Sequence, residues 1–268
     1  MKVQRALRFV CRGALLATLA LGVFAGSFTH YSYVHQFRDI PNAAPSSSHW
    51  LGTDALGRDL FTRLVYGTRV SLLLAPAAAL IASIIAAILG AIAGLRGGWL
   101  EKIILASADL SMSLPLLFVL IALRSILPLD VSPILSVIAT FLALGLIGWP
   151  ASLRVVWAAS RDLRDSDHIL LAQALGYRRS QILFRQVLPC LRPVFLAQFW
   201  ISIPLFILTE ATLSMLGLGV MEPLPSWGNL LRGCEDLSAN PWRLVPLVVL
   251  VLTVISFQFI FPGSEELA

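Results

Sequence analysis

Two acidic residues, Asp109 and Glu210, stand within long apolar runs of the sequence, where a charged group is costly to place. Acidic side chains inside a membrane normally face a cavity or a partner, so both are candidates to line a translocation path or gate. The alternative for each is a structural role. Asp109 could pair with Arg96 or Lys102 near the inner membrane surface, and Glu210 could form a structural hydrogen bond to a neighbouring helix, such as that of Ser214 or Thr209.

The sequence lacks the usual patterns of nucleotide, metal and covalent chemistry. It has no G-x-x-x-x-G-K-[ST] loop to hold ATP phosphates, and no G-x-S-x-G, H-E-x-x-H or C-x-x-C pattern. Its three cysteines are odd in number and have no metal-like spacing: Cys11, Cys190 and Cys234. The four histidines lie in or beside loops, lack ligand partners at helical spacing and are expected to be solvated residues at the membrane interface: His30, His35, His49 and His168. The sequence therefore predicts a non-catalytic chain that binds no metal or cofactor itself.

Composition indicates a membrane protein. The chain has 268 residues, of which 57% are hydrophobic and 13% are charged, whereas a soluble domain carries about 25% charged residues. This leaves too little charge for a water-facing surface, which argues against a soluble enzyme and against disorder. The net charge of +5 does not indicate a nucleic-acid binder, because the basic residues lie at the ends of apolar runs.

Six stretches meet or approach the length of about 20 apolar residues that a helix needs to cross the hydrocarbon core. They are Gly13–Val34, Ser71–Leu95, Ile103–Leu123, Val131–Leu153, Pro193–Leu216 and Leu244–Ser264. We therefore expect an all-α integral membrane protein with six transmembrane helices. The expected division is a cytoplasmic stub with the first helix (1–35), an outer segment (36–69), a core of five helices (70–262) and a short tail (263–268).

The basic residues also predict the orientation. With both termini in the cytoplasm, 13 of the 20 Lys and Arg residues fall in inner segments, as the positive-inside rule requires. The first span has an alternative interpretation. Basic residues, a short apolar core over Gly13–Phe24 and small residues at Ala25–Ser27 are also typical of a cleaved signal peptide.

The longest inner loop, 161–192, is unusually apolar. Asp167 can cap a short helix over His168–Leu175, and Gly176 suits the left-handed position that ends it. Ser180 can cap a second helix over Gln181–Leu188. The leucines of the first helix would gain about 1.5–3 kcal/mol each on burial, so this helix should dock on something. Either it packs on the protein's own helix ends or the lipid interface, or it is a plug for a cytoplasmic partner.

Three stretches in this order resemble one known family. Leu171–Pro189 (LAQALGYRRSQILFRQVLP) resembles the EAA loop of type I ABC importer permeases. Trp50–Val70 (WLGTDALGRDLFTRLVYGTRV) and Leu208–Asn229 (LTEATLSMLGLGVMEPLPSWGN) are similar to segments of the second permease subunit in dipeptide, oligopeptide and nickel importers. The resemblance extends roughly from Trp50 to Ser256. It implies the type I ABC importer permease fold, in the inner membrane.

The resemblance also implies partners. The chain would be the permease subunit of an ATP-driven importer, forming a path for di- or oligopeptides with a second homologous permease in the lipid bilayer. An external solute-binding protein would deliver the substrate, and two cytoplasmic ATPases would bind the ATP and Mg²⁺. Nickel or another small solute is the alternative cargo.

Residue roles follow from the same resemblance. The loop that couples to the ATPases would contain Leu170, Leu171, Ala172, Ala174, Leu175, Gly176 and Pro189. The outer-loop motif would contain Gly52, Asp54, Gly57, Arg58 and Asp59. This outer loop either folds on itself through an Asp–Arg pair or docks the solute-binding protein. Trp227 either anchors at the membrane interface or contacts the gate.

The sequence departs from the family pattern in the inner loop and at both ends of the chain, where the segment before the first span is also short. The glutamate of the EAA pattern falls at Leu170 and its first alanine at Leu171, and the charged C-terminal tail of relatives is missing. Two other classes of function are alternatives to an importer subunit. A proton-driven secondary transporter would use Asp109 and Glu210 and would show inverted repeats, which the sequence does not display. A membrane scaffold would tolerate any substitution in the inner loop.

Overall fold

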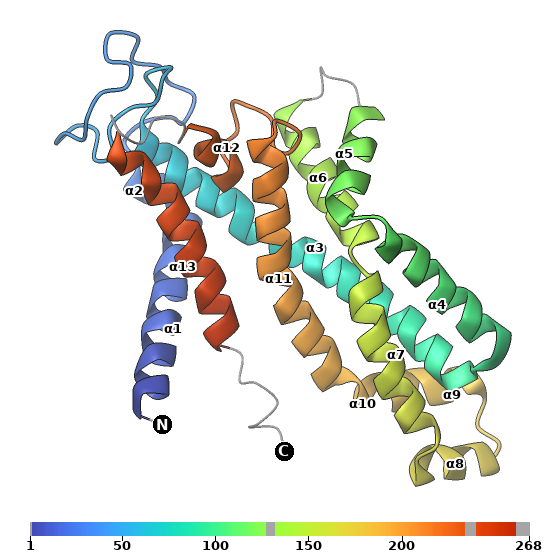
Figure 1. Cartoon of the computed structure of the whole chain (residues 1–268). Coiled ribbons are helices and arrows are strands. Elements are labelled where there is room, and N and C mark those ends of the chain that lie inside the picture. Colours follow the sequence, from blue (N-terminus) through green and yellow to red (C-terminus); the bar gives the residue numbers. More distant parts are fainter. Residues whose placement is uncertain (1, 127–131, 234–239, 261–268) are drawn as a thin grey trace. The chain divides into compact units, whose positions relative to one another are not determined.

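Figure 1 shows the computed structural model of the chain, which describes residues 2–126, 132–233 and 240–260, without the side chains of 2–7, 124 and 126. The regular elements of these described residues are helices, and their extended segments contribute only one isolated bridge, between Thr53 and Asp59. The expectation of an all-α protein is confirmed.

Four helical stretches among the described residues are long and apolar enough to cross a membrane. They are α3 (Leu60–Arg96), α6 with α7 (Pro133–Ile147 and Pro150–Arg164), α11 (Arg192–Met215), and a 3-10 turn with α13 (Pro241–Leu244 and Val245–Ile260). A fifth span exists only if α4 (Gly98–Ser113) and α5 (Leu116–Ile126) act as one.

The predicted third span, Ile103–Leu123, is therefore not one straight helix. α4 ends at Ser113, and the two helices meet at an angle of 81°. Leu114 is extended, with φ −99° and ψ 129°, because the following Pro115 disfavours helical backbone at the residue before it. The sequence is apolar on both sides of this break, so hydropathy alone does not indicate it.

The predicted first span is also shifted. The helix α1 covers Lys2–Val23 and a single turn, α2, covers Ala25–Phe28, so helical structure ends before the predicted limit at Val34. A sixth span is not confirmed. The last predicted span reaches into residues 261–264, and the predicted tail at 263–268 lies wholly outside the described residues.

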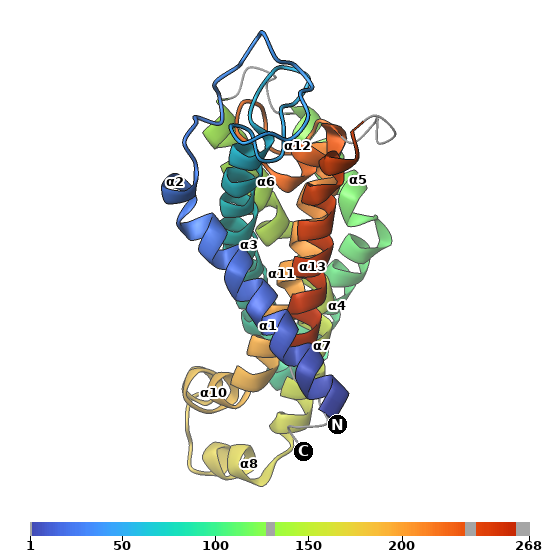
Figure 2. The ribbon, with the colours of Figure 1, turned by 90° about the vertical axis from the view of Figure 1, so that its left-hand side faces the viewer.

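The chain divides into two compact units. The first unit contains residues 1–75, 123–141 and 203–268, and the second contains 76–122 and 142–202. Within the first unit, α1 packs along α13, as Figures 1 and 2 both show, and α12 (Trp227–Arg232) packs against α13.

Within the second unit, α4 packs against α7, and α3 approaches α7 closely. A Cβ atom at Gly90 would lie 2.9 Å from Cβ of Val156, and one at Gly94 would lie 2.7 Å from Cβ of Ser160. The Ser160 hydroxyl donates to the carbonyl of Ala91, 3.2 Å away. Glycine allows this backbone contact because it has no side chain to separate the helices.

The inner loop contains more helical turns than predicted. It forms α8 (Asp167–Ala174), α9 (Arg179–Ile182), a π-helical turn (Leu183–Val187) and α10 (Leu188–Cys190). The residue at the N-cap of α8 is Ser166 rather than Asp167, because Ser166 is extended and its hydroxyl donates to the carbonyl of Leu163, closing the preceding helix. The second predicted helix begins at Arg179 rather than Gln181.

Candidate functional site

One face of α8 anchors the inner loop to the second unit. Ile169 is fully buried, and Ala172 is buried beside it in an apolar cluster. The other buried members of this cluster come from α3, α7 and the turns after α8: Ala91, Val156, Ile182, Val187 and Leu191. Ala172, which the resemblance assigned to the ATPase contact, therefore faces the chain's own core, whereas Ala174 is exposed.

The end of α8 is fixed by backbone hydrogen bonds. The amide of Tyr177 donates to the carbonyl of Ala172 at 3.1 Å, and the amide of Gly176 donates to that of Gln173 at 3.0 Å. Together they form a Schellman motif, which places the residue after the helix in the left-handed region. Gly176 has φ +77°, so the predicted left-handed glycine is confirmed.

The opposite face of α8 is apolar and uncovered in the single chain. Leu171 is 62% exposed and Leu175 is 67% exposed, with Leu170 half exposed beside them. The two predicted alternatives for this helix, packing on the chain itself and docking on a partner, are therefore compatible. One face packs on the chain, and the other face remains free. Pro189 lies further along the loop, exposed on α10.

A fixed ion pair lies just before α8. Arg164 donates to both carboxylate oxygens of Asp165, over 3.1 and 3.4 Å. This hydrogen bonding to the charged form lowers the pKa of Asp165 below its ordinary value.

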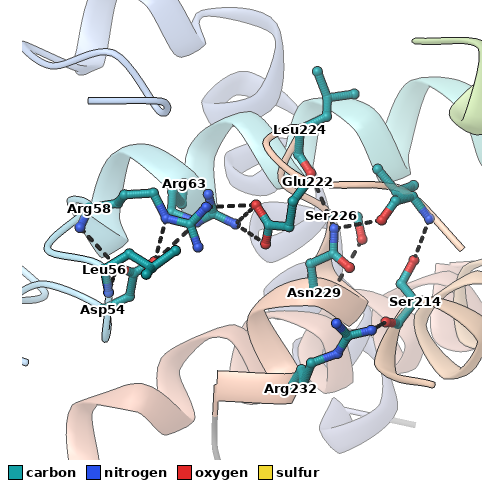
Figure 3. Close-up of polar contacts among 11 residues, drawn as sticks. Asp54, Leu56, Arg58, Arg63, Ser214, Glu222, Leu224, Ser226, Asn229 and Arg232 are labelled. Carbon is teal, nitrogen blue, oxygen red and sulfur yellow. Dashed lines mark hydrogen bonds and ion pairs between the residues drawn. The ribbon is translucent and has the colours of Figure 1, made fainter. Parts of the chain in front are cut away.

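The outer segment, in the first unit, carries a network of charged side chains (Figure 3). Arg58 donates to Asp54 and to Glu222, over 2.7 Å in each case. Arg63, whose side chain is only 2% exposed, donates to both oxygens of Glu222, over 2.8 and 3.0 Å. We call these four residues the outer network. The predicted Asp–Arg pair is present, as Asp54 and Arg58.

The outer network includes two residues that the sequence analysis missed, Arg63 and Glu222. Their positions are 159 residues apart, and no local spacing rule connects residues at that separation. Arg63 has one detectable signal, because it is a charged residue one turn into a long apolar helix. Such a charge needs a partner when it is buried.

The other residues of the outer motif shape the turn before α3. Asp54 also accepts from the amides of Leu56 and Arg58. Asp59 accepts from the amide of Thr62 at 2.7 Å, which caps α3, and bonds His49 Nδ1 at 2.9 Å. His49 is buried, so it is not the solvated residue that the sequence predicted.

Two glycines of this motif have backbone conformations that other residues rarely adopt. Gly52 has φ +71° and Gly57 has φ +73°. A Cβ atom at Gly57 would lie 2.2 Å from the carbonyl oxygen of Phe37. Glycine is therefore required here both for conformation and for space.

The two intramembrane acids have different surroundings. Asp109 is exposed and pairs with Arg154, so its partner is neither Arg96 nor Lys102. Glu210 is fully buried and accepts hydrogen bonds from Ser214 at 2.6 Å and from Ser71 at 3.4 Å. These serine contacts favour the structural alternative for Glu210. A role in a translocation path stays a prediction for both acids.

Trp227, the third residue predicted at the gate, is buried at the start of α12. Its Nε1 donates to the hydroxyl of Thr68 in α3, 2.9 Å away. Within this chain it is a packing residue rather than an exposed interfacial anchor.

Among the residues that the structure describes, no group of three or more His, Cys, Asp and Glu side chains could hold a metal ion.

Comparisons with known proteins converge on one class of relative. The chain is 34% identical over 254 residues to the oligopeptide transport system permease protein OppC of Bacillus subtilis, covering 94% of this chain and 81% of that protein. It is 32% identical over 255 residues to the dipeptide transport system permease protein DppC of the same organism, covering 94% and 78%. It is 37% identical over 229 residues to a putative peptide permease protein of Brucella suis, covering 84% and 74%.

A family model described as "Binding-protein-dependent transport system inner membrane component" matches residues 86–264. This match covers most of the helical core, including the inner loop, and agrees with the apolar spans of the structure. The chain therefore belongs to the family of inner membrane components of binding-protein-dependent transport systems.

Proposed function

We propose that this chain is the non-catalytic permease subunit of an ATP-driven importer for di- or oligopeptides. A second, homologous permease completes the path, an external solute-binding protein delivers the peptide, and two cytoplasmic ATPases bind ATP and Mg²⁺. The family match and the peptide-transport names of the relatives support this assignment. Both termini lie in the cytoplasm in this proposal, in keeping with the distribution of basic residues.

The observation that carries the proposal is the two-sided character of α8. Its inner face is fixed in the chain's own core, and its outer face presents Leu170, Leu171 and Leu175. Covering exposed leucines yields about 1.5–3 kcal/mol each. A rigid, capped helix with an uncovered apolar face is the structure expected for docking into a groove of another protein.

The same anchoring explains how a pull on α8 moves the permease. Ile169 packs in one cluster with Ala91 of α3 and Val156 of α7. Packed interiors deform little, so displacement of α8 by a closing ATPase pair carries these helices with it. The resulting change between inward-facing and outward-facing states is largely a rigid-body motion.

Substitution of Gly176 tests the coupling. Gly176→Val forces a β-branched residue into the left-handed region, a strain of about 1–2 kcal/mol, although its Cβ meets no atom within 4 Å. ATP-dependent uptake of a radiolabelled dipeptide into proteoliposomes should fall more than tenfold. Gly176→Asn is the matched control, because Asn tolerates this conformation, and it should retain most of the uptake.

Co-purification of the permeases and ATPases checks that both variants assemble. Full uptake with Gly176→Val would count against coupling through α8. Uptake without any ATPase would contradict the whole proposal and favour a secondary transporter. Competition by unlabelled peptides, but not by a nickel chelate, is expected for a peptide importer.

A further inference from the structure

A polar cavity of 400 Å³ lies beside α8 in the second unit. Its charged lining consists of Arg96 at the end of α3, Arg164 and Asp165 at the end of α7, and Arg179 at the start of α9. Leu170 contributes to the apolar part of the wall. Three arginines thus line one cavity, with a single acidic residue among them.

The three arginines are not equivalent. Arg164 already donates to both oxygens of Asp165. Arg96 and Arg179 are exposed, and neither makes an ion pair or side-chain hydrogen bond within residues 2–126, 132–233 and 240–260. The residues that line the cavity therefore carry an excess of two positive charges. Glu101, which is not part of the lining, interacts with Arg164, whereas Arg96 and Arg179 keep no acidic partner among the described residues.

We infer that this cavity is a receptor for an acidic side chain of the cytoplasmic ATPase, which binds between Arg96 and Arg179. A guanidinium pairs with a carboxylate through two parallel hydrogen bonds, and this geometry favours an Asp or Glu side chain. The inference deepens the proposed function, on which it rests, because it specifies the charge of the surface that the ATPase presents.

The surroundings of the cavity indicate a protein as the source of the carboxylate. Leu170 belongs both to the cavity wall and to the exposed apolar face of α8, next to Leu171. A single partner surface can therefore cover the leucines and place an acid in the cavity. An apolar centre with charge pairs at its edge is the usual arrangement of a protein interface.

Position 170 adds to this argument. The EAA pattern has a glutamate at this position, and this chain has Leu170. With leucine there, position 170 contributes no negative charge to the cavity, and the lining includes no acidic residue of α8. The partner supplies it instead.

The test uses the assembled permease pair in nanodiscs, titrated with the ATPase subunits of the same transporter. Arg96→Gln with Arg179→Gln should weaken ATPase binding about tenfold, the effect of losing two charge pairs near a surface. Arg96→Glu with Arg179→Glu should weaken it further, and an Asp or Glu→Lys change in the ATPase groove should restore it. Arg185→Glu is the matched control, an exposed arginine of the same loop outside the cavity lining, and should change little.

The possible outcomes are distinct. If wild-type permease binds no ATPase, both the proposed function and this inference fail. If wild-type permease binds and the double Gln variant binds equally well, the inference alone is overturned. Loss of a tightly bound anionic lipid in native mass spectrometry, with unchanged ATPase affinity, would assign the cavity to a lipid headgroup and also overturn it. Because Arg96 and Arg179 are exposed and make no ion pair or side-chain hydrogen bond in the described chain, thermal stability should change little throughout.

Discussion

The outer segment and the inner loop use charge in opposite ways. In the outer network, Arg58 and Arg63 bind Asp54 and Glu222 of the same chain. In the inner loop, Arg179 faces a cavity without an acidic partner in the described chain, and neighbouring leucines are exposed. The outer segment is therefore held together by its own ion pairs, whereas the inner loop leaves both charge and apolar surface available to another protein.

The two regions also differ in what anchors them. The outer segment is tied down by hydrogen bonds between charged groups far apart in the sequence, and the inner loop by apolar packing of Ile169 and Ala172. Substitutions should therefore destabilise the two regions by different mechanisms and by different amounts.

Ile169→Ala should have the largest effect on stability. Removing three buried carbon atoms from a packed cluster costs about 2–5 kcal/mol, and α8 should detach from the second unit. Unfolding of the purified protein in denaturant measures the loss. Protease accessibility of the loop should rise in parallel, and a change below about 1 kcal/mol would contradict the assigned packing.

Glu222→Gln should have an intermediate effect. It removes the negative charge that offsets the buried Arg63 and one of the two oxygens that accept from it. Glu222 is 43% exposed, and solvent screening reduces the loss to about 1–3 kcal/mol. Thermal unfolding is the measurement. Arg58→Gln should cost less, because Arg63 keeps its bonds to Glu222. Equal stability of Glu222→Gln and the wild type would show that the outer network orients its side chains without stabilising the fold.

Asp109→Asn should have a small effect. Asp109 and Arg154 are both half exposed, and exposed ion pairs contribute about 0.2–1 kcal/mol. Thermal unfolding in low and high salt should distinguish this pair from the outer network, because salt screens an exposed ion pair more than a buried one. If Asp109 lines the path instead, peptide uptake would fall without any change in stability.

Leu171→Asp should leave stability nearly unchanged, within about 0.5 kcal/mol, because the side chain is 62% exposed. Binding of the ATPase should nevertheless fall strongly, since the variant places a charge in an apolar contact. Comparison with Ile169→Ala on the same helix separates the two faces of α8. A substantially lowered melting temperature would mean that Leu171 packs on its own chain.

Sequence patterns predicted the features that depend on local chemistry. Apolar length identified four of the six predicted spans as helices long enough to cross a membrane. Gly176 marked the end of α8 because only a left-handed residue closes a Schellman motif there. The break at Leu114 was missed, since hydropathy is insensitive to backbone direction. The π-helical turn at Leu183–Val187 was missed as well, because no side-chain pattern distinguishes it from an α-helix.

Contacts between residues that are distant in the sequence were the least predictable feature of the structure. The network formed by Arg63 and Glu222, and the pairing of Asp109 with Arg154, depend on how the helices meet. Composition indicates that a buried charge needs a partner, but it does not identify the partner.

The glycine contact between α3 and α7 has a mechanical consequence. Where Gly90 and Gly94 touch α7, no side chain of α3 separates the two helices, and the contacting atoms of α7 include Cβ of Val156 and Cβ of Ser160. A rotamer change does not move a Cβ atom, so little of this contact can absorb a small shift. A displacement of α7 is therefore transmitted almost directly to the backbone of α3. A methyl group at either glycine would push the two helices apart. The mutant would still fold, but movement of α7 would reach α3 less directly.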